Sequence, residues 1–135
     1  MAANTQPIYP VLPKLGWATL TTANSAYDGT GTVSTVYTAG TSGARIDQLR
    51  IKSLGLNTQN VLRVFVNNNA TNTVASNNSL IAELTLTATN ASQSSSSTDI
   101  RLPLDIVLPA NYKLNVTIGT TSANGWQITA EGGDY

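Results

Sequence analysis

The residues that most often perform enzymatic chemistry are scarce in this sequence. It contains no cysteine and no histidine. Their absence excludes thiolate catalysis, disulfide bonds, a Ser-His-Asp triad and a metal site with histidine ligands. Carboxylates remain, and a glycosidase needs two of them facing each other across a cleft. The sequence has seven, which are Asp28, Asp47, Glu83, Asp99, Asp105, Glu131 and Asp134.

Two of these carboxylates, Asp99 and Asp105, fall on the polar side of one alternating segment together with Arg101. This grouping favours a solvated face with an ion pair over a catalytic dyad. The stretch DGTG, which starts at Asp28, is typical of a turn and is too short for a calcium loop. We therefore predict no enzymatic activity, no cofactor and no metal. A hydrolase with Asp99, Asp105 and Glu131 in one cleft is the competing hypothesis.

Composition limits the partners of the chain. Its 135 residues fit one domain, and only 10% of them are charged, compared with about 25% in an average protein. Seven basic and seven acidic residues cancel, so no basic stripe is available for nucleic acid or an anionic membrane. The start, MAANTQPIYPVLPKLG, lacks the features of a signal peptide, and no segment approaches the ~20 apolar residues of a membrane helix. We expect folding in the cytoplasm, with no nucleic-acid or membrane partner.

Short alternating segments separated by turn residues run through most of the chain, which is typical of an all-β fold. We predict an antiparallel β-sandwich over residues 15–135. Its eight strands are expected near 16–22, 32–38, 45–54, 60–67, 80–88, 99–108, 112–118 and 126–131. Two long polar connections, 67–79 and 89–98, favour a jelly roll. An immunoglobulin-like sandwich is the alternative, although the Cys-Trp-Cys pattern is absent.

The last two segments, 112–118 and 126–131, alternate most regularly, and we expect them to form a hairpin. Its apolar side, which includes Trp126, is expected to close the sandwich. Its polar side, which includes Asn115 and Thr117, is expected to meet solvent or a neighbour. In the segment before this pair, Pro103 predicts an edge position or a bulge, because proline cannot donate to a central ladder.

Residues 1–14 differ from the rest, because Pro7, Pro10 and Pro13 recur at every third position. Each proline fixes its own backbone angle and pushes the preceding residue to an extended conformation. This predicts an extended arm with polyproline-II character. Apolar side chains lie between the prolines, so the arm is expected to pack against a surface. Either it docks on a partner or it folds back along its own sheet.

Aromatic side chains on a β-sandwich can stack on a sugar ring. The candidates are Trp17, Tyr27, Tyr37, Tyr112 and Trp126. Trp126 lies on the same side of its segment as Ile128, which favours a position in the core. Trp17 follows the arm directly and can anchor the arm or a neighbouring subunit, because an indole buries a large area.

The chain resembles small structural proteins of tailed bacteriophages, and most closely their head decoration (cement) proteins of the jelly-roll type. The resemblance runs from Trp17 to Tyr135, behind a proline-containing arm. The segments on which it rests are WATLTTANSAYDGTGTVSTVYTAGTSGARIDQLRIKSLG, VLRVFVNNN, LIAELTL and LPANYKLNVTIGTTSANGWQITAEGGDY.

The resemblance implies a structural virion protein that binds the outer surface of the phage head after synthesis in the host cytoplasm. It implies that the chain bridges neighbouring major capsid subunits as a homodimer or homotrimer and has no catalytic residue. Terminal arms and loops make the contacts in such proteins. The partner-binding residues expected from this are Pro7, Ile8, Tyr9, Pro10, Val11, Leu12 and Trp17. A receptor-binding or carbohydrate-binding module of a head or tail fibre is the alternative.

Overall fold

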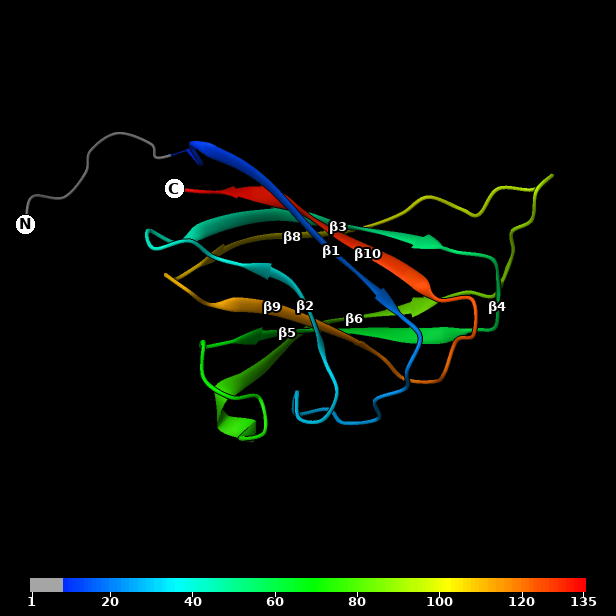
Figure 1. The fold of residues 1–135 in the computed structure, drawn as a ribbon, viewed down its shortest axis with the longest axis horizontal. Coiled ribbons are helices and arrows are strands. Elements are labelled where there is room, and N and C mark those ends of the chain that lie inside the picture. Colours follow the sequence, from blue (N-terminus) through cyan, green and yellow to red (C-terminus); the bar gives the residue numbers. More distant parts are fainter. Residues whose placement is uncertain (1–8) are drawn as a thin grey trace, which may run out of the picture.

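The computed structural model describes residues 9–135, which form two antiparallel four-stranded sheets packed face to face (Figure 1). The first sheet has the strand order β1-β10-β3-β8 and the second has the order β2-β9-β5-β6, while β4 and β7 form a small ribbon. The elements are β1 (Leu12–Leu20), β2 (Ser34–Thr38), β3 (Ala44–Ser53), β4 (Leu56–Asn57), β5 (Asn60–Asn67), the 3-10 helix η1 (Ala75–Asn77), β6 (Asn78–Leu86), β7 (Thr89–Asn90), β8 (Ile100–Leu108), β9 (Lys113–Ile118) and β10 (Trp126–Asp134). No helix within residues 9–135 is long and apolar enough to cross a membrane.

The long strands pair in nested order. The first pairs with the last, β1 with β10, and the next pairs inward are β2 with β9, β3 with β8 and β5 with β6. A long antiparallel ribbon that folds over into two sheets gives this order, and the result is a jelly roll. The jelly-roll prediction is confirmed, and the immunoglobulin-like alternative is wrong.

The eight predicted segments correspond to the eight long strands. The described residues contain ten strands, because β4 and β7 are present in addition. Each of these two has only two residues, which is too short for an alternating pattern to indicate it.

The core lies between the two sheets and receives side chains from every long strand. Buried examples, one from each strand, are Leu20, Val36, Leu49, Leu62, Leu86, Leu108, Val116 and Trp126. Burying an aliphatic side chain of this size stabilises the fold by about 1.5–3 kcal/mol. Trp126 is completely buried, which confirms its predicted place in the core.

Pro103 lies where its chemistry predicts. Its strand, β8, is an edge strand of the first sheet. The register between β3 and β8 shifts next to it, between Ile46 and Gln48. Asp105, two residues further on, has a φ of 50°, which marks the distorted backbone of the bulge. Both expectations for Pro103, an edge and a bulge, are therefore confirmed.

The predicted terminal hairpin is wrong, because β9 and β10 belong to opposite sheets. β9 pairs with β2 and β5, whereas β10 pairs with β1 and β3. The connection between them, residues 119–125, crosses from one sheet to the other. Alternation shows which side of a strand is buried but not which strand lies beside it, so the pattern could not reveal this crossing.

The outer face of the second sheet is covered by the chain's own loops. Asn115 and Thr117, expected on an exposed polar side, are 3% and 2% exposed. The connection between β1 and β2 lies against this sheet, since Ala23 bridges to β9 and the Arg63 side chain donates to the Asn24 carbonyl. The Arg63 guanidinium also stacks on the Tyr27 ring, 4.0 Å from its centroid. The outer side of β5 and β9 is therefore covered, whereas the edge strand β6 of the same sheet remains partly exposed.

The first strand begins earlier than the sequence predicts. The prediction ended the arm at Lys14, but β1 starts at Leu12, so Leu12, Pro13 and Lys14 pair with β10. An extended arm and the start of an edge strand share the same backbone geometry, and this is why the sequence could not separate them. The expectation for residues 1–8 lies outside the described residues.

Candidate interaction surface

Large apolar side chains are exposed along β1 and just before it. They are Tyr9, Val11, Leu12, Leu15 and Trp17, which we call the β1 ridge; their exposed fractions are 75%, 72%, 61%, 59% and 64%. Within the strand, Leu15 and Trp17 point outward, while Ala18 and Leu20 on the alternate side point toward the interior. Scattered exposed apolar residues are ordinary, but a contiguous row rimmed by polar residues marks an interaction site.

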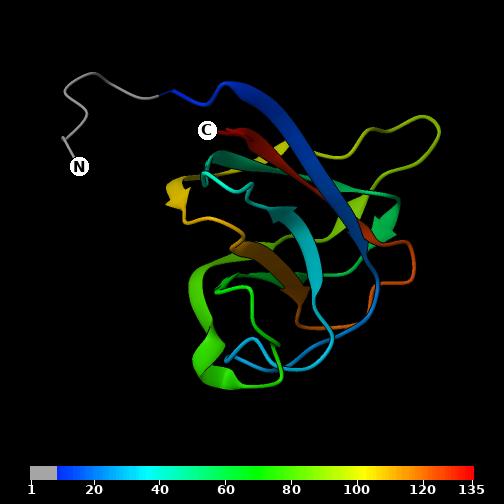
Figure 2. The ribbon, with the colours of Figure 1, turned by 60° about the vertical axis from the view of Figure 1, so that its left-hand side comes forward.

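A close backbone contact determines the course of β1. The strand runs close to β2 (Figure 2), and Gly16 lies directly against the Val36 carbonyl. A Cβ atom at Gly16 would lie 1.8 Å from the carbonyl oxygen of Val36. Only glycine therefore allows β1 to approach β2 this closely, directly beside Trp17.

A polar cluster holds the beginning of β1 against β2 and the chain end. Lys14 Nζ donates to the Thr38 carbonyl at 2.6 Å and lies 3.2 Å from the Asp134 carboxylate. The Tyr37 hydroxyl donates to the same carboxylate at 2.9 Å, and the Gly40 N–H donates at 3.2 Å. These bonds join β1 to β2 and β10. The strand that displays the ridge is therefore held firmly against the rest of the sandwich.

The same contacts change the acidity of this cluster. Burial raises the pKa of Asp134, but hydrogen bonds from Tyr37, a backbone N–H and Lys14 outweigh it, so the net pKa lies below its ordinary value. Burial and the bond to Asp134 raise the pKa of Tyr37. The carboxylate is therefore ionised and the phenol protonated at neutral pH.

Beyond the ridge, the outer face of the first sheet becomes polar and charged. Trp17 lies opposite Thr129 on β10, and Leu15 lies opposite Glu131. Glu131 pairs with Arg50 at 2.7 Å and accepts a bond from Gln48 at 2.7 Å. The bonds from Gln48 and Arg50 lower the pKa of Glu131. The face therefore combines an apolar edge with a centre in which the charges are balanced.

The structure brings together the described part of the expected partner-binding set. Tyr9, Pro10 and Val11 lead directly into β1, which begins at Leu12 and displays Trp17. Pro7 and Ile8 lie outside the described residues. The sequence analysis missed Leu15, although its position two residues before Trp17 on an alternating strand places it on the same side. Binding by these residues stays a prediction.

The carboxylates considered for catalysis take part in ion pairs. Asp99 pairs with Arg101, as the sequence predicts, and Asp105 pairs with Arg45. No group of three or more acidic side chains within residues 9–135 is arranged to hold a metal ion. Asp28 accepts bonds from the Thr30 N–H and hydroxyl, which lower its pKa and confirm its role in a turn.

Of the aromatic candidates for sugar stacking, two are exposed and two are buried. Trp126 and Tyr37 are buried in the core, while Tyr112 is partly buried against it. Trp17 and Tyr27 are equally exposed, but one face of the Tyr27 ring is covered by Arg63. Trp17 is therefore the better placed of these rings for contact with another molecule.

The fold and the ridge define a jelly-roll domain with one bare sheet face and an apolar edge. No family model matches the sequence, and no curated protein matches it. A solved structure of infectious bursal disease virus, Gx strain, contains a similar chain, with 14% identity over 98% of this chain and 37% of that chain and a TM-score of 0.38. A chain in a structure of the Gt strain is similar too, with 15% identity over 98% of this chain and 34% of that chain and a TM-score of 0.35. The chain spans little more than a third of these neighbours, and at these TM-scores the likeness decides nothing about function.

Proposed function

We propose that the chain is a structural virion protein, a decoration protein that binds the outer surface of a phage head. The β1 ridge is its attachment surface, and the bound chain bridges neighbouring major capsid subunits. The observation behind this proposal is the exposure of Trp17 and Leu15 on an anchored strand. Aromatic rings bury about 150–250 Å² each and dominate binding energy at interfaces.

The difference between the two sheets supports this orientation. In the centre of the second sheet, outer side chains such as Phe65 and Arg63 on β5 are buried. The first sheet has both the ridge and most of the ion pairs on its bare outer face. A partner centred on the β1 ridge would bury its apolar side chains at the core of the contact and leave the ion pairs at the polar rim, which is the usual composition of an interface.

The surface chemistry also suits neighbouring copies of the same chain. The net charge is zero, so identical copies do not repel one another at long range. Many serine, threonine and asparagine side chains can form hydrogen bonds across a wet contact. The proposal therefore includes a homodimer or homotrimer on the capsid surface. Jelly rolls occur in viral capsid domains, which is support by analogy only.

A second function, receptor or carbohydrate binding in a head or tail fibre, is favoured by the exposed indole of Trp17. Jelly rolls also occur in lectin domains, and a bare aromatic ring can stack on a sugar. This function requires few copies of the chain in each particle, whereas decoration of the shell requires many.

Copy number distinguishes the two functions. The experiment is quantitative mass spectrometry of purified virions, with the major capsid protein as the internal standard. Decoration predicts a copy number comparable to that of the capsid protein. A handful of copies would favour the fibre function, and absence from particles would contradict both.

A further inference from the structure

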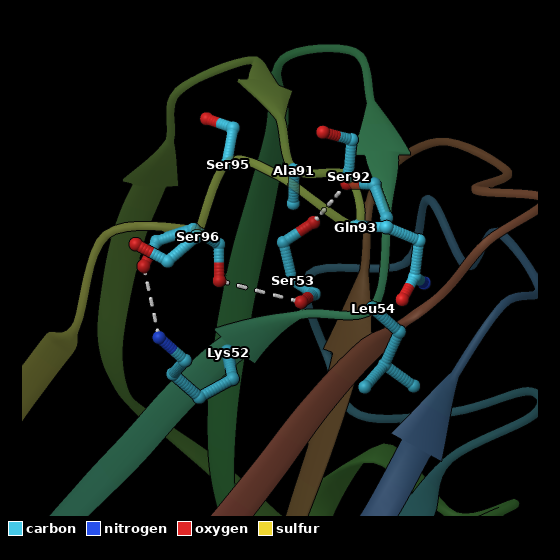
Figure 3. A pocket seen from close by; sticks show the side chains of 10 residues that line it. Lys52, Ser53, Leu54, Ala91, Ser92, Gln93, Ser95 and Ser96 are labelled. Atoms are coloured by element: carbon cyan, nitrogen blue, oxygen red, sulfur yellow. Dashed lines mark hydrogen bonds between the residues drawn. The ribbon is translucent and has the colours of Figure 1, made fainter.

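We propose that this protein has a second binding site, a serine-rich hollow at one end of the sandwich, which binds an acidic sugar through Lys52. The hollow lies between the turn after β3 and residues 91–97 (Figure 3). In Figure 1 this segment projects from the end opposite the start of β1. The hollow therefore uses none of the residues of the β1 ridge.

Hydrogen bonds hold the base of the hollow in place. The β4–β7 ribbon brings the two walls together by pairing Asn57 with Thr89. Ser53 Oγ donates to the Gly55 carbonyl at 2.7 Å and accepts a bond from Asn57 Nδ2 at 2.8 Å. The volume is 360 Å³, within the ~300–1,000 Å³ range of ligand pockets. The hollow is therefore large enough for a sugar ring, and hydrogen bonds from Lys52 and Ser97 tie residues 91–97 to the end of β3.

The positive charge of Lys52 determines which charge a ligand of the hollow should have. Lys52 Nζ donates to the Ser97 carbonyl at 2.9 Å and makes no ion pair within residues 9–135. An ammonium has three N–H donors, so two are free for a ligand. No carboxylate lines the hollow. A cation without a counterion favours a ligand with a negative charge, and a carboxylate is a good partner for an ammonium.

The rest of the lining favours a sugar over a simple anion. Serine hydroxyls, which both donate and accept, surround the opening together with the Gln93 amide. Sugar hydroxyls have the same dual capacity. Leu54 is 49% exposed and provides an apolar wall for the C–H side of a ring. No aromatic side chain lines the hollow, which disfavours a nucleobase that would need stacking.

The test is a titration of isotope-labelled protein followed by two-dimensional amide NMR. The probes are D-glucuronate, D-glucose and inorganic phosphate. Glucose is the matched neutral probe, because it has a hydroxymethyl group where glucuronate has a carboxylate. We expect glucuronate to shift the amides of residues 52–55 and 91–97 saturably, and glucose and phosphate to bind about tenfold more weakly or not at all.

Two variants assign the effect to Lys52. Lys52→Gln should reduce glucuronate affinity about tenfold, to the level of glucose. Lys113→Gln is the control, because Lys113 also makes no ion pair within the described residues and lies outside the hollow. The same spectra show whether each variant is folded.

Four results would overturn the proposal. They are no saturable shift at the hollow with glucuronate, equal binding of glucose, equal binding of phosphate, and undiminished glucuronate binding by Lys52→Gln. Equal binding of phosphate would show an anion site without sugar recognition. None of these results bears on attachment through the β1 ridge.

Discussion

The two tryptophans show how local context decides the role of a residue. Both lie on alternating strands, and both strands belong to the first sheet. Trp126 points inward with Ile128 and is completely buried. Trp17 points outward with Leu15 and is 64% exposed. The burial of Trp126 could be predicted, because its side of the strand is apolar throughout. The direction of Trp17 could not, because both sides of β1 contain apolar residues.

This difference predicts opposite effects of truncation on stability. Trp126→Ala should lower the free energy of unfolding by about 3–5 kcal/mol, because it leaves a large cavity. Trp17→Ala should change it by less than about 0.5 kcal/mol, as for most surface substitutions. Urea unfolding followed by circular dichroism measures both. A large loss for Trp17→Ala would show that the ridge stabilises the fold and is not a free surface.

The lowered pKa of Glu131 predicts a contribution to acid sensitivity. A carboxyl whose folded pKa lies below its ordinary value of 4.5 stabilises the protein above that pH. This stability is lost as the pH falls through the lower folded value. Glu131→Gln should therefore reduce the loss of stability between pH 6 and pH 3. Urea midpoints across this range provide the measurement, and identical pH profiles for the variant and the wild type would contradict the prediction.

At the scale of elements, the sequence predicted where the long strands lie but not how they pair. Alternation located all eight long strands, and Pro103 correctly predicted a bulged edge. The partners of β9 and β10 were missed, because pairing across the sandwich depends on contacts between distant segments. The burial of Asn115 and Thr117 was also missed, since it results from loops that fold over the second sheet. The strand β1 could be predicted from its alternation. The exposed side of β1 could not, because apolar residues occur on both sides of the strand.

The close approach of β1 to β2 predicts a strict requirement for glycine. Gly16→Ala would place a methyl group 1.8 Å from the Val36 carbonyl oxygen, so the two strands must separate. We expect a loss of at least about 1–3 kcal/mol, as in overpacked cores. Gly119→Ala is the matched control, because its nearest contact would be 3.6 Å, an ordinary van der Waals distance. Thermal unfolding of both variants tests this, and equal stabilities would argue against the close approach.

At the scale of the whole molecule, the jelly roll leaves one sheet face and one end available for partners. The covered second sheet makes the domain asymmetric, and the anchored β1 ridge marks the side that faces a partner. The serine-rich hollow lies away from this ridge. The hollow uses none of the ridge residues, so substitutions at the two surfaces can be tested independently.

The most direct measurement is cosedimentation of the purified chain with phage heads that lack it. The wild type is compared with Trp17→Ala and with Tyr27→Ala, which removes an equally exposed ring from the connection between β1 and β2. Thermal unfolding first establishes that both variants are folded. We predict that Trp17→Ala weakens binding by about tenfold to a hundredfold, as expected for an aromatic hot spot, and that Tyr27→Ala binds like the wild type. Undiminished binding by Trp17→Ala, or an equal loss for Tyr27→Ala, would contradict attachment through the β1 ridge.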